Sequence, residues 1–122
     1  MQDVDTTIQT IKDIVNRFRD ERDWRQYNDP KSVAEALSIE AAELLEVFLW
    51  KDKTEIAKEL HENQGFRTTL ADEMADVLVY LLELSTDTEI DLSEAVANKI
   101  KKNELKYPIS KSKGNKVKYT EL

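Results

Sequence analysis

The chain has 122 residues, of which 40% are hydrophobic and 35% are charged, and its formal net charge at pH 7 is −7. This length fits one domain over residues 1–122, and two glycines and two prolines are too few for the turns of a β-sandwich or barrel, so we predict an all-α fold. The absence of cysteine excludes disulfides and thiolate chemistry, and the single histidine excludes a His-His metal site, so any metal must be held by carboxylates, which favour Mg²⁺, Ca²⁺ or Mn²⁺.

The first two predicted helices are marked by apolar spacing and by a cap. Four apolar residues recur every three or four positions: Ile8, Ile11, Val15 and Phe18. This spacing predicts an amphipathic helix over residues 6–23, followed by a connecting loop over 24–28. Asp29 followed by Pro30 is typical of a helix start, so we predict a second helix that runs to about Lys51.

A charged segment precedes a long apolar one in the middle of the chain. Residues 53–64 are highly charged and are followed by Gly65, so they form either a short helix or a weakly buried link. From Phe66 to about Leu84 the sequence is apolar almost all round, which predicts a central helix buried on most of its sides. Residues 85–90 are expected to form a loop.

The last predicted helix begins at a cap pair, Asp91 and Glu94, and ends near Tyr107 and Pro108. The lysine- and serine-rich residues 109–122 have little to bury and are predicted to be an extended arm or tail. The expected architecture is therefore a helical bundle of about four main helices. Because a domain of this size buries a modest fraction of its surface, we expect oligomerisation to complete the core.

Charge is distributed unevenly along the chain. Residues 1–98 hold 10 basic and 23 acidic side chains, whereas residues 99–122 hold eight lysines and two glutamates. The acidic body argues against nucleic-acid binding. The longest uncharged apolar stretch, residues 77–82, is far short of the roughly 20 residues that span a bilayer, and residues 1–13 have no apolar core of a secretory signal, so we predict a cytoplasmic protein.

Carboxylates interrupt the apolar face of two predicted helices. On a wheel of about 100° per residue, Glu40 and Glu43 lie within about 60° of each other. Four apolar residues lie beside them on the wheel: Val33, Ala36, Leu44 and Val47. Glu73 and Asp76 repeat the three-residue spacing on the central helix, where their neighbours on the wheel are Val77, Tyr80 and Leu84.

Several unpaired carboxylates in apolar surroundings are costly unless they are protonated, paired or bound to a cation. Basic residues are scarce in both segments, so a divalent metal is the simplest compensation, as in other helix-bundle carboxylate sites. The alternative is that these acids are ordinary solvated helix surface, which most single ExxE matches are. The presence of two such pairs on neighbouring helices favours the metal site.

These residues resemble a known family. Glu40-x-x-Glu43 and Glu73-x-x-Asp76 are similar to the ExxE…ExxD signature of the MazG-like all-α nucleoside triphosphate pyrophosphohydrolases. Over about residues 8–122, the chain resembles the dCTP pyrophosphatase branch most closely. That likeness is carried by five segments: residues 21–24 (ERDW), 43–50, 76–80, 106–108 (KYP) and 118–122 (KYTEL).

The resemblance implies Mg²⁺-dependent hydrolysis of a nucleoside triphosphate between its α- and β-phosphates, with Mn²⁺ as a substitute cation. It also implies a homotetramer, a dimer of dimers, with sites built from more than one subunit. The catalytic, metal-binding carboxylates would be Glu40, Glu43, Glu73 and Asp76. The substrate contacts that it implies are Tyr80, Lys99 and Asn103 at the phosphates and Trp24 and Trp50 at the base.

One position departs from the resemblance. Val15 stands where the vertebrate-type dCTP enzyme places a histidine in its base pocket, so the base preference is open. Two enzymatic alternatives keep the fold: a substrate such as dUTP or a modified nucleotide, or phosphoribosyl-ATP. A third alternative is a non-catalytic helical interaction module whose acids are ordinary surface charge.

Overall fold

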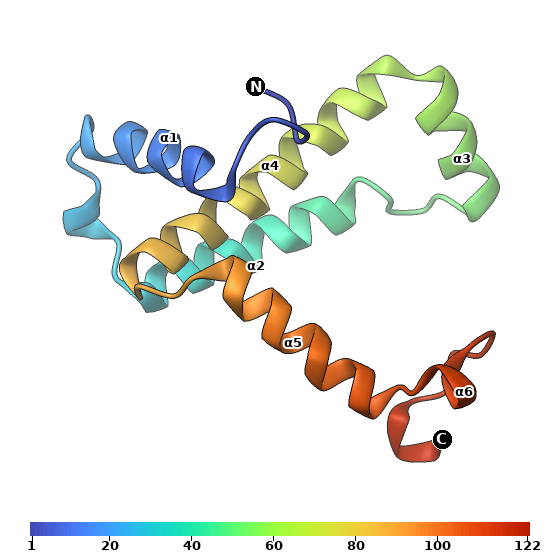
Figure 1. Cartoon of the computed structure of the whole chain (residues 1–122). Coiled ribbons are helices and arrows are strands. Elements are labelled where there is room, and N and C mark those ends of the chain that lie inside the picture. Colours follow the sequence, from blue (N-terminus) through green and yellow to red (C-terminus); the bar gives the residue numbers. More distant parts are fainter. The chain divides into compact units, whose positions relative to one another are not determined.

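The structure, a computed structural model, describes residues 1–122 and contains helices but no strand, which confirms the all-α prediction. The helices are α1 (Ile8–Asp20), η1 (Arg25–Tyr27), α2 (Pro30–Glu46), α3 (Lys53–Glu62), α4 (Gln64–Asp87), α5 (Leu92–Lys106), α6 (Ile109–Ser112) and η2 (Tyr119–Glu121), where η denotes a 3-10 helix. They form two compact units, residues 1–89 and 90–122 (Figure 1). No helix has the length and apolar character needed to cross a membrane.

Helices α1 and α2 begin near their predicted starts but end early. The first ends at Asp20, and the segment predicted as a loop contains the short helix η1. Helix α2 ends at Glu46 and not near Lys51, because the chain must leave the helix before Asp52 can cap α3. Asp52 has an extended backbone and forms a capping box with Glu55.

The charged middle segment is a helix, α3, which decides between the two structures predicted for it. Asn63 both ends α3 and begins α4, since its side chain accepts a hydrogen bond from the backbone N–H of Phe66. Helix α4 then continues to Asp87, so the predicted loop at residues 85–90 is wrong over its first three positions. Polar contacts with α1 hold those positions in the helix.

The first unit is built on α2 and α4, which lie side by side and make its most extensive helix contact (Figure 1). Helix α1 and helix α3 also lie against α4. The buried apolar residues are Val15, Val33, Phe66 and Leu82. Helix α4 nevertheless exposes Met74, Leu78 and Leu81, so within one chain it is not the helix buried on most sides that the sequence predicts.

Polar side chains join α1 to α4. Arg19 is fully buried, and its Nη1 and Nη2 atoms donate to the carboxylate of Asp87 at 2.8 and 2.7 Å. Glu83 Oε2 lies 3.6 Å from Arg19 Nη1. Two further hydrogen bonds cross the same contact, Lys12 Nζ to Ser85 Oγ and Asn16 Nδ2 to Thr86 Oγ1. Burial raises the pKa of the Glu83 carboxyl, and the positive charge of Arg19 opposes that shift.

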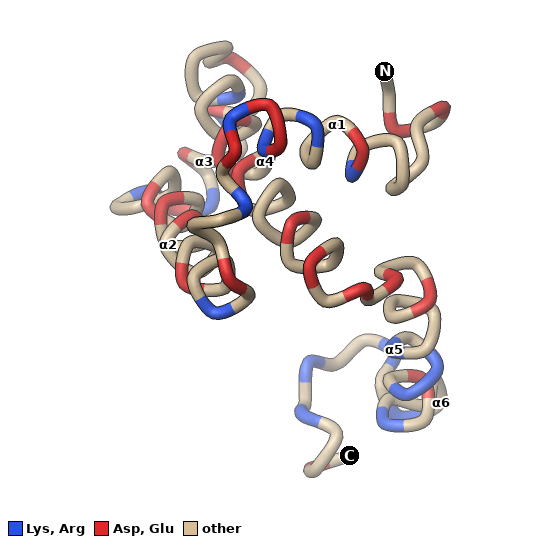
Figure 2. Tube along the Cα trace, turned by 90° about the vertical axis from the view of Figure 1, so that its left-hand side faces the viewer, with Lys and Arg blue, Asp and Glu red and all other residues tan.

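The second unit consists of α5 and the folded segment that follows it. Asp91 caps α5 by accepting from the backbone N–H of Glu94 at 2.8 Å, in agreement with the predicted start. The segment predicted as an extended arm contains α6 and η2, and the Tyr119 ring packs edge-to-face on Tyr107 at 5.8 Å. Lysines follow one another along α5 and the segment after it, as Figure 2 shows.

Candidate metal centre and nucleotide site

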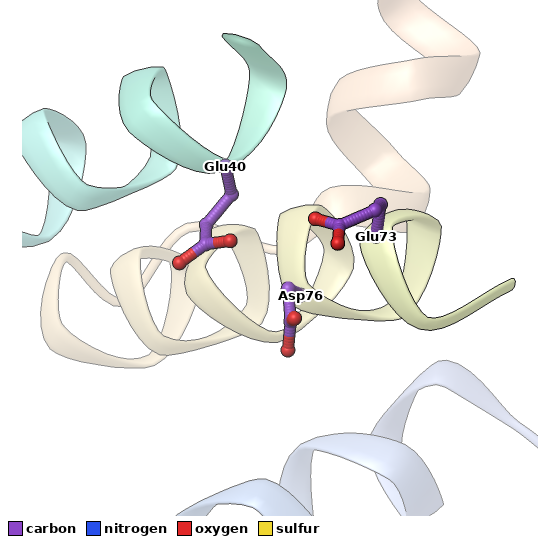
Figure 3. A group of neighbouring side chains, drawn as sticks. All are labelled: Glu40, Glu73 and Asp76. Carbon is purple, nitrogen blue, oxygen red and sulfur yellow. The ribbon is translucent and has the colours of Figure 1, made fainter. Parts of the chain in front are cut away.

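Three carboxylates from two helices converge in the first unit. Glu40 on α2 and Glu73 and Asp76 on α4 each place a carboxylate oxygen within 4.8 Å of the others (Figure 3). Glu40 and Glu73 are half-buried, and Asp76 is exposed. Oxygen donors at this separation fit a single hard divalent cation such as Mg²⁺ or Mn²⁺.

The core face of each helix carries these glutamates. Val33 is 1% exposed and lies seven residues before Glu40, which is two helical turns and therefore the same face of α2. Phe66 is likewise buried, and it lies seven residues before Glu73 on α4. The packing that holds α2 against α4 therefore also turns these carboxylates toward each other.

The electrostatics of the cluster fit a cation. Burial raises the pKa of the Glu40 carboxyl, and the negative charges of Glu43, Asp76 and Glu73 raise it further. Burial and the charges of Glu43 and Asp76 raise the pKa of Glu73 in the same way. Glu73 Oε2 is buried and accepts no hydrogen bond, and no lysine or arginine pairs with these three carboxylates. A bound cation would supply the missing partner.

Glu43, the fourth predicted ligand, lies outside the group that comes within 4.8 Å. It lines a neighbouring hollow of about 240 Å³ together with Glu46, Val47, Thr69 and Glu73. Its charge still contributes to the raised pKa values of Glu40 and Glu73. Glu43 thus borders the cluster from one side of Glu73.

Tyr80 lies one helical turn after Asp76 on α4 and is half-buried. Burial raises the pKa of its phenol, and the negative charge of Glu40 raises it further. The phenol therefore stays protonated at neutral pH and is available as a hydrogen-bond donor beside the carboxylates.

The two tryptophans lie at helix ends in the first unit. Trp24 follows α1, is 47% exposed and packs edge-to-face on Phe18 with ring centroids 5.7 Å apart. Trp50 lies between α2 and α3, is 91% exposed and has a positive φ of 62°, which is uncommon for a bulky residue. Val15, where the resemblance leads one to look for a histidine, is buried in α1.

Lys99 and Asn103 belong to the second unit. They are four residues apart on α5, so they lie on the same face of that helix. Lys99 is exposed and Asn103 is half-buried. Their residue types suit contacts to an anion, by charge and by an amide N–H respectively.

The sequence interpretation missed the buried ion cluster of Arg19, Glu83 and Asp87. A signal was present, because Arg19 is four residues after Val15 and so lies on the same face of α1 as the apolar stripe. Glu83 and Asp87 are likewise four residues apart on α4. A charged residue on an apolar stripe predicts a buried partner of opposite charge.

The chain is similar to proteins of known type. Residues 36–122 match the model of the MazG-like family. The chain is 37% identical over 116 residues to dCTP pyrophosphatase 1 from Mus musculus, and 36% identical over 120 residues to the protein of that name from Homo sapiens, covering 95% of this chain and 68% of each relative. A crystal structure of a pyrophosphatase from Archaeoglobus fulgidus matches with a TM-score of 0.74 and 44% identity, covering 83% of this chain and 92% of that one.

Proposed function

This chain belongs to the MazG-like family, as its ExxE…ExxD motif predicts, and we propose that it is a nucleotide pyrophosphohydrolase that converts a (d)NTP to the (d)NMP and pyrophosphate. The convergence of Glu40, Glu73 and Asp76 on one point, with an unpartnered Glu73 oxygen, carries the proposal. The names of the similar proteins support the same reaction class and favour dCTP-like substrates. A house-cleaning or pool-balancing role follows from that substrate class.

The carboxylates would hold Mg²⁺, with Glu43 at the edge of the site and Mn²⁺ as a substitute cation. When bound, the cation supplies charge neutralisation at the phosphates and lowers the pKa of water. Glu40 from α2 and Glu73 and Asp76 from α4 would be its ligands. One of the surrounding carboxylates would accept the proton of the attacking water.

The remaining predicted residues bind and orient the substrate. The Tyr80 phenol donates a hydrogen bond to a phosphate oxygen, Lys99 supplies positive charge and the Asn103 amide donates a further hydrogen bond. Trp24 and Trp50 stack against the base. No protein nucleophile is required, because hydrolysis of a phosphoanhydride depends on positioning and on charge neutralisation.

The reaction itself can be tested with a panel of nucleoside triphosphates in ¹⁸O-labelled water with Mg²⁺. We expect the label in the monophosphate and none in pyrophosphate, because the water is proposed to attack the α-phosphorus. Because Val15 offers no polar group to a base, we expect dCTP to be hydrolysed with limited discrimination against dUTP and modified nucleotides. Orthophosphate and a diphosphate as first products would refute this reaction, and no hydrolysis of any nucleotide would favour a non-catalytic interaction module.

Mg²⁺ should also stabilise the folded chain. A cation that binds only the folded state raises its stability by mass action, by about 2.7 kcal/mol at one hundred times the dissociation constant. Compared with EDTA, millimolar Mg²⁺ should therefore raise the melting temperature by several degrees. Glu40→Gln should reduce this shift, whereas Glu35→Gln, an exposed acid on α2, should leave it intact. An unchanged melting temperature in wild type would argue against an organised cation site.

The protein is further proposed to be a homotetramer, a dimer of dimers. Large apolar side chains are exposed on both α2 and α4, among them Ile39 at 59%, Leu45 at 70% and Met74 at 56%. Exposed apolar area of this kind marks an interface in a soluble protein. Sedimentation at micromolar concentration should therefore give a mass near four chains of 14.2 kDa. A folded monomer under those conditions would contradict this assembly.

A further inference from the structure

A closed turn at the end of α1 sets the position of Trp24. The backbone N–H of Trp24 donates to the carbonyl of Arg19 at 3.1 Å, and that of Asp23 donates to the carbonyl of Asp20 at 3.0 Å. Asp23 has a positive φ of 53°. These two bonds and the left-handed backbone of Asp23 form a Schellman motif, which reverses the chain directly after a helix.

Side-chain contacts fix the same turn. The Trp24 ring packs edge-to-face on Phe18, which lies in the last turn of α1, at an interplanar angle of 79°. The Arg22 guanidinium lies 3.7 Å above the Phe18 ring, and its Nη1 donates to the Phe18 carbonyl at 2.9 Å. Trp24 is therefore a half-exposed indole that is held by Phe18 and has the Arg22 guanidinium 5.9 Å from its ring centroid.

The turn depends on the residue type at Asp23. A positive φ is unfavourable for L-residues other than glycine, asparagine and aspartate, and most unfavourable for β-branched residues. The Asp23 carboxylate and its carbonyl also both accept from Gln26 Nε2, at 2.8 and 3.0 Å. An aspartate is thus compatible with the left-handed backbone, and its hydrogen bonds with Gln26 also connect the turn to the 3-10 helix η1.

We propose that Asp23 is a positioning residue for substrate binding, which acts by holding the half-exposed Trp24 indole in the orientation that contacts the nucleotide base. The inference rests on the proposed function, in which Trp24 is a wall of the base pocket. Presenting the ring in one orientation before binding removes the ordering cost that a mobile exposed side chain would add. The effect should appear in KM and not in kcat, because stacking on the base is uniform through the reaction.

The test compares substitutions at Asp23 in dCTP hydrolysis with Mg²⁺. Asp23→Val, which disfavours the left-handed backbone, should raise KM about threefold to tenfold with kcat within about twofold, as expected from partial loss of a stacking contact. Asparagine and glycine both adopt a positive φ readily, so Asp23→Asn and Asp23→Gly should keep KM near the wild-type value. Glu21→Val is the matched control, since it introduces the same residue at a nearby exposed position with an ordinary φ of −59°. It removes a 3.8 Å ion pair with the exposed Arg22, and such surface pairs contribute little to stability.

Two further measurements separate positioning from a general loss of structure. In a Trp24→Ala background, Asp23→Val should cause no additional rise in KM, because the ring through which it acts is absent. With Trp50→Phe removing the other indole, Asp23→Val should increase quenching of Trp24 fluorescence by acrylamide, whereas Glu21→Val should not.

Several outcomes would overturn the inference. An equal rise in KM from Asp23→Val with and without Trp24 would assign the effect to general destabilisation. Unchanged KM and quenching in Asp23→Val would show that Asp23 does not hold the ring. If Trp24→Ala leaves KM unchanged while dCTP is hydrolysed, the inference fails and the proposed reaction stands. If no nucleotide is hydrolysed, the proposed function fails, and the quenching experiment still decides whether Asp23 positions Trp24.

Discussion

Glu73→Gln is expected to lower kcat for nucleotide hydrolysis by a factor of about 100 or more, which corresponds to at least about 2.7 kcal/mol of lost transition-state stabilisation. Glu73 belongs to both the converging group and the adjoining hollow, and one of its oxygens is buried without a partner. The amide keeps the size of the side chain but removes the negative charge that a cation needs. Initial rates at saturating Mg²⁺ and nucleotide give the comparison.

The matched control for this prediction is Glu35→Gln. Glu35 is exposed on α2 and contacts Lys31 at 3.7 Å, away from the cluster, so the kcat of Glu35→Gln should remain near the wild-type value. Partial recovery of Glu73→Gln at higher Mg²⁺ would be consistent with weakened cation binding. Full activity of Glu73→Gln at wild-type Mg²⁺ would remove this carboxylate from the mechanism.

Arg19→Met should cost about 3–5 kcal/mol of folding free energy, which is a large part of the total stability of a domain of this size. The substitution keeps much of the side-chain volume but removes the cation that lies between buried Glu83 and half-buried Asp87. The half-exposed Arg25, whose Nη1 lies 3.6 Å from Asp87 Oδ1, is then the only cation beside them. Urea titration at pH 7.5 and fixed protein concentration measures the loss. Arg17→Met, which removes an exposed positive charge from the same helix, should change stability by less than about 0.5 kcal/mol.

The loss from Arg19→Met should also depend on pH. The pKa of Glu83 is raised in the folded state, so between its ordinary value of 4.5 and the raised value the folded state binds more protons than the unfolded state. The contribution of Glu83 to the free energy of unfolding therefore falls as pH rises through that window, and it returns as pH falls. Without the Arg19 charge, the pKa of Glu83 rises further, so part of the lost stability should return near pH 5. A loss below about 1 kcal/mol at both pH values would contradict the role assigned to Arg19.

Side-chain patterns predicted the helices better than they predicted the helix ends. The apolar period and the Asp29 and Asp91 caps placed the starts of α2 and α5, because these signals are local in sequence. The end of α4 was predicted too early, because Asp87 stays helical through an ion pair with Arg19, 68 residues away. A pattern of neighbouring residues cannot predict a contact between residues so far apart in the sequence.

The candidate site was likewise predicted where its signals are local in sequence and missed where they depend on packing. The three-residue spacing of the acids predicted which side chains share a helix face, and packing of α2 on α4 then brings Glu40, Glu73 and Asp76 together. The sequence did not separate Glu43 from this group, because a shared helix face does not say which of two acids lies nearest the acids of the other helix. Glu43 is exposed and lies outside the group, whereas Glu40 is half-buried and lies within it. Lys99 and Asn103 lie in the other compact unit, so their part in the site rests on the family resemblance.

The single residue between α3 and α4 makes the length of this junction inflexible. Asn63 is the C-cap of one helix and the N-cap of the next, so the chain has no spare residue there to absorb an insertion or a deletion. One added helical residue would turn α3 by about 100° and shift it by about 1.5 Å relative to α4. Variation in chain length among related sequences should therefore accumulate at the turns around residues 47–51 and 88–91 and avoid position 63.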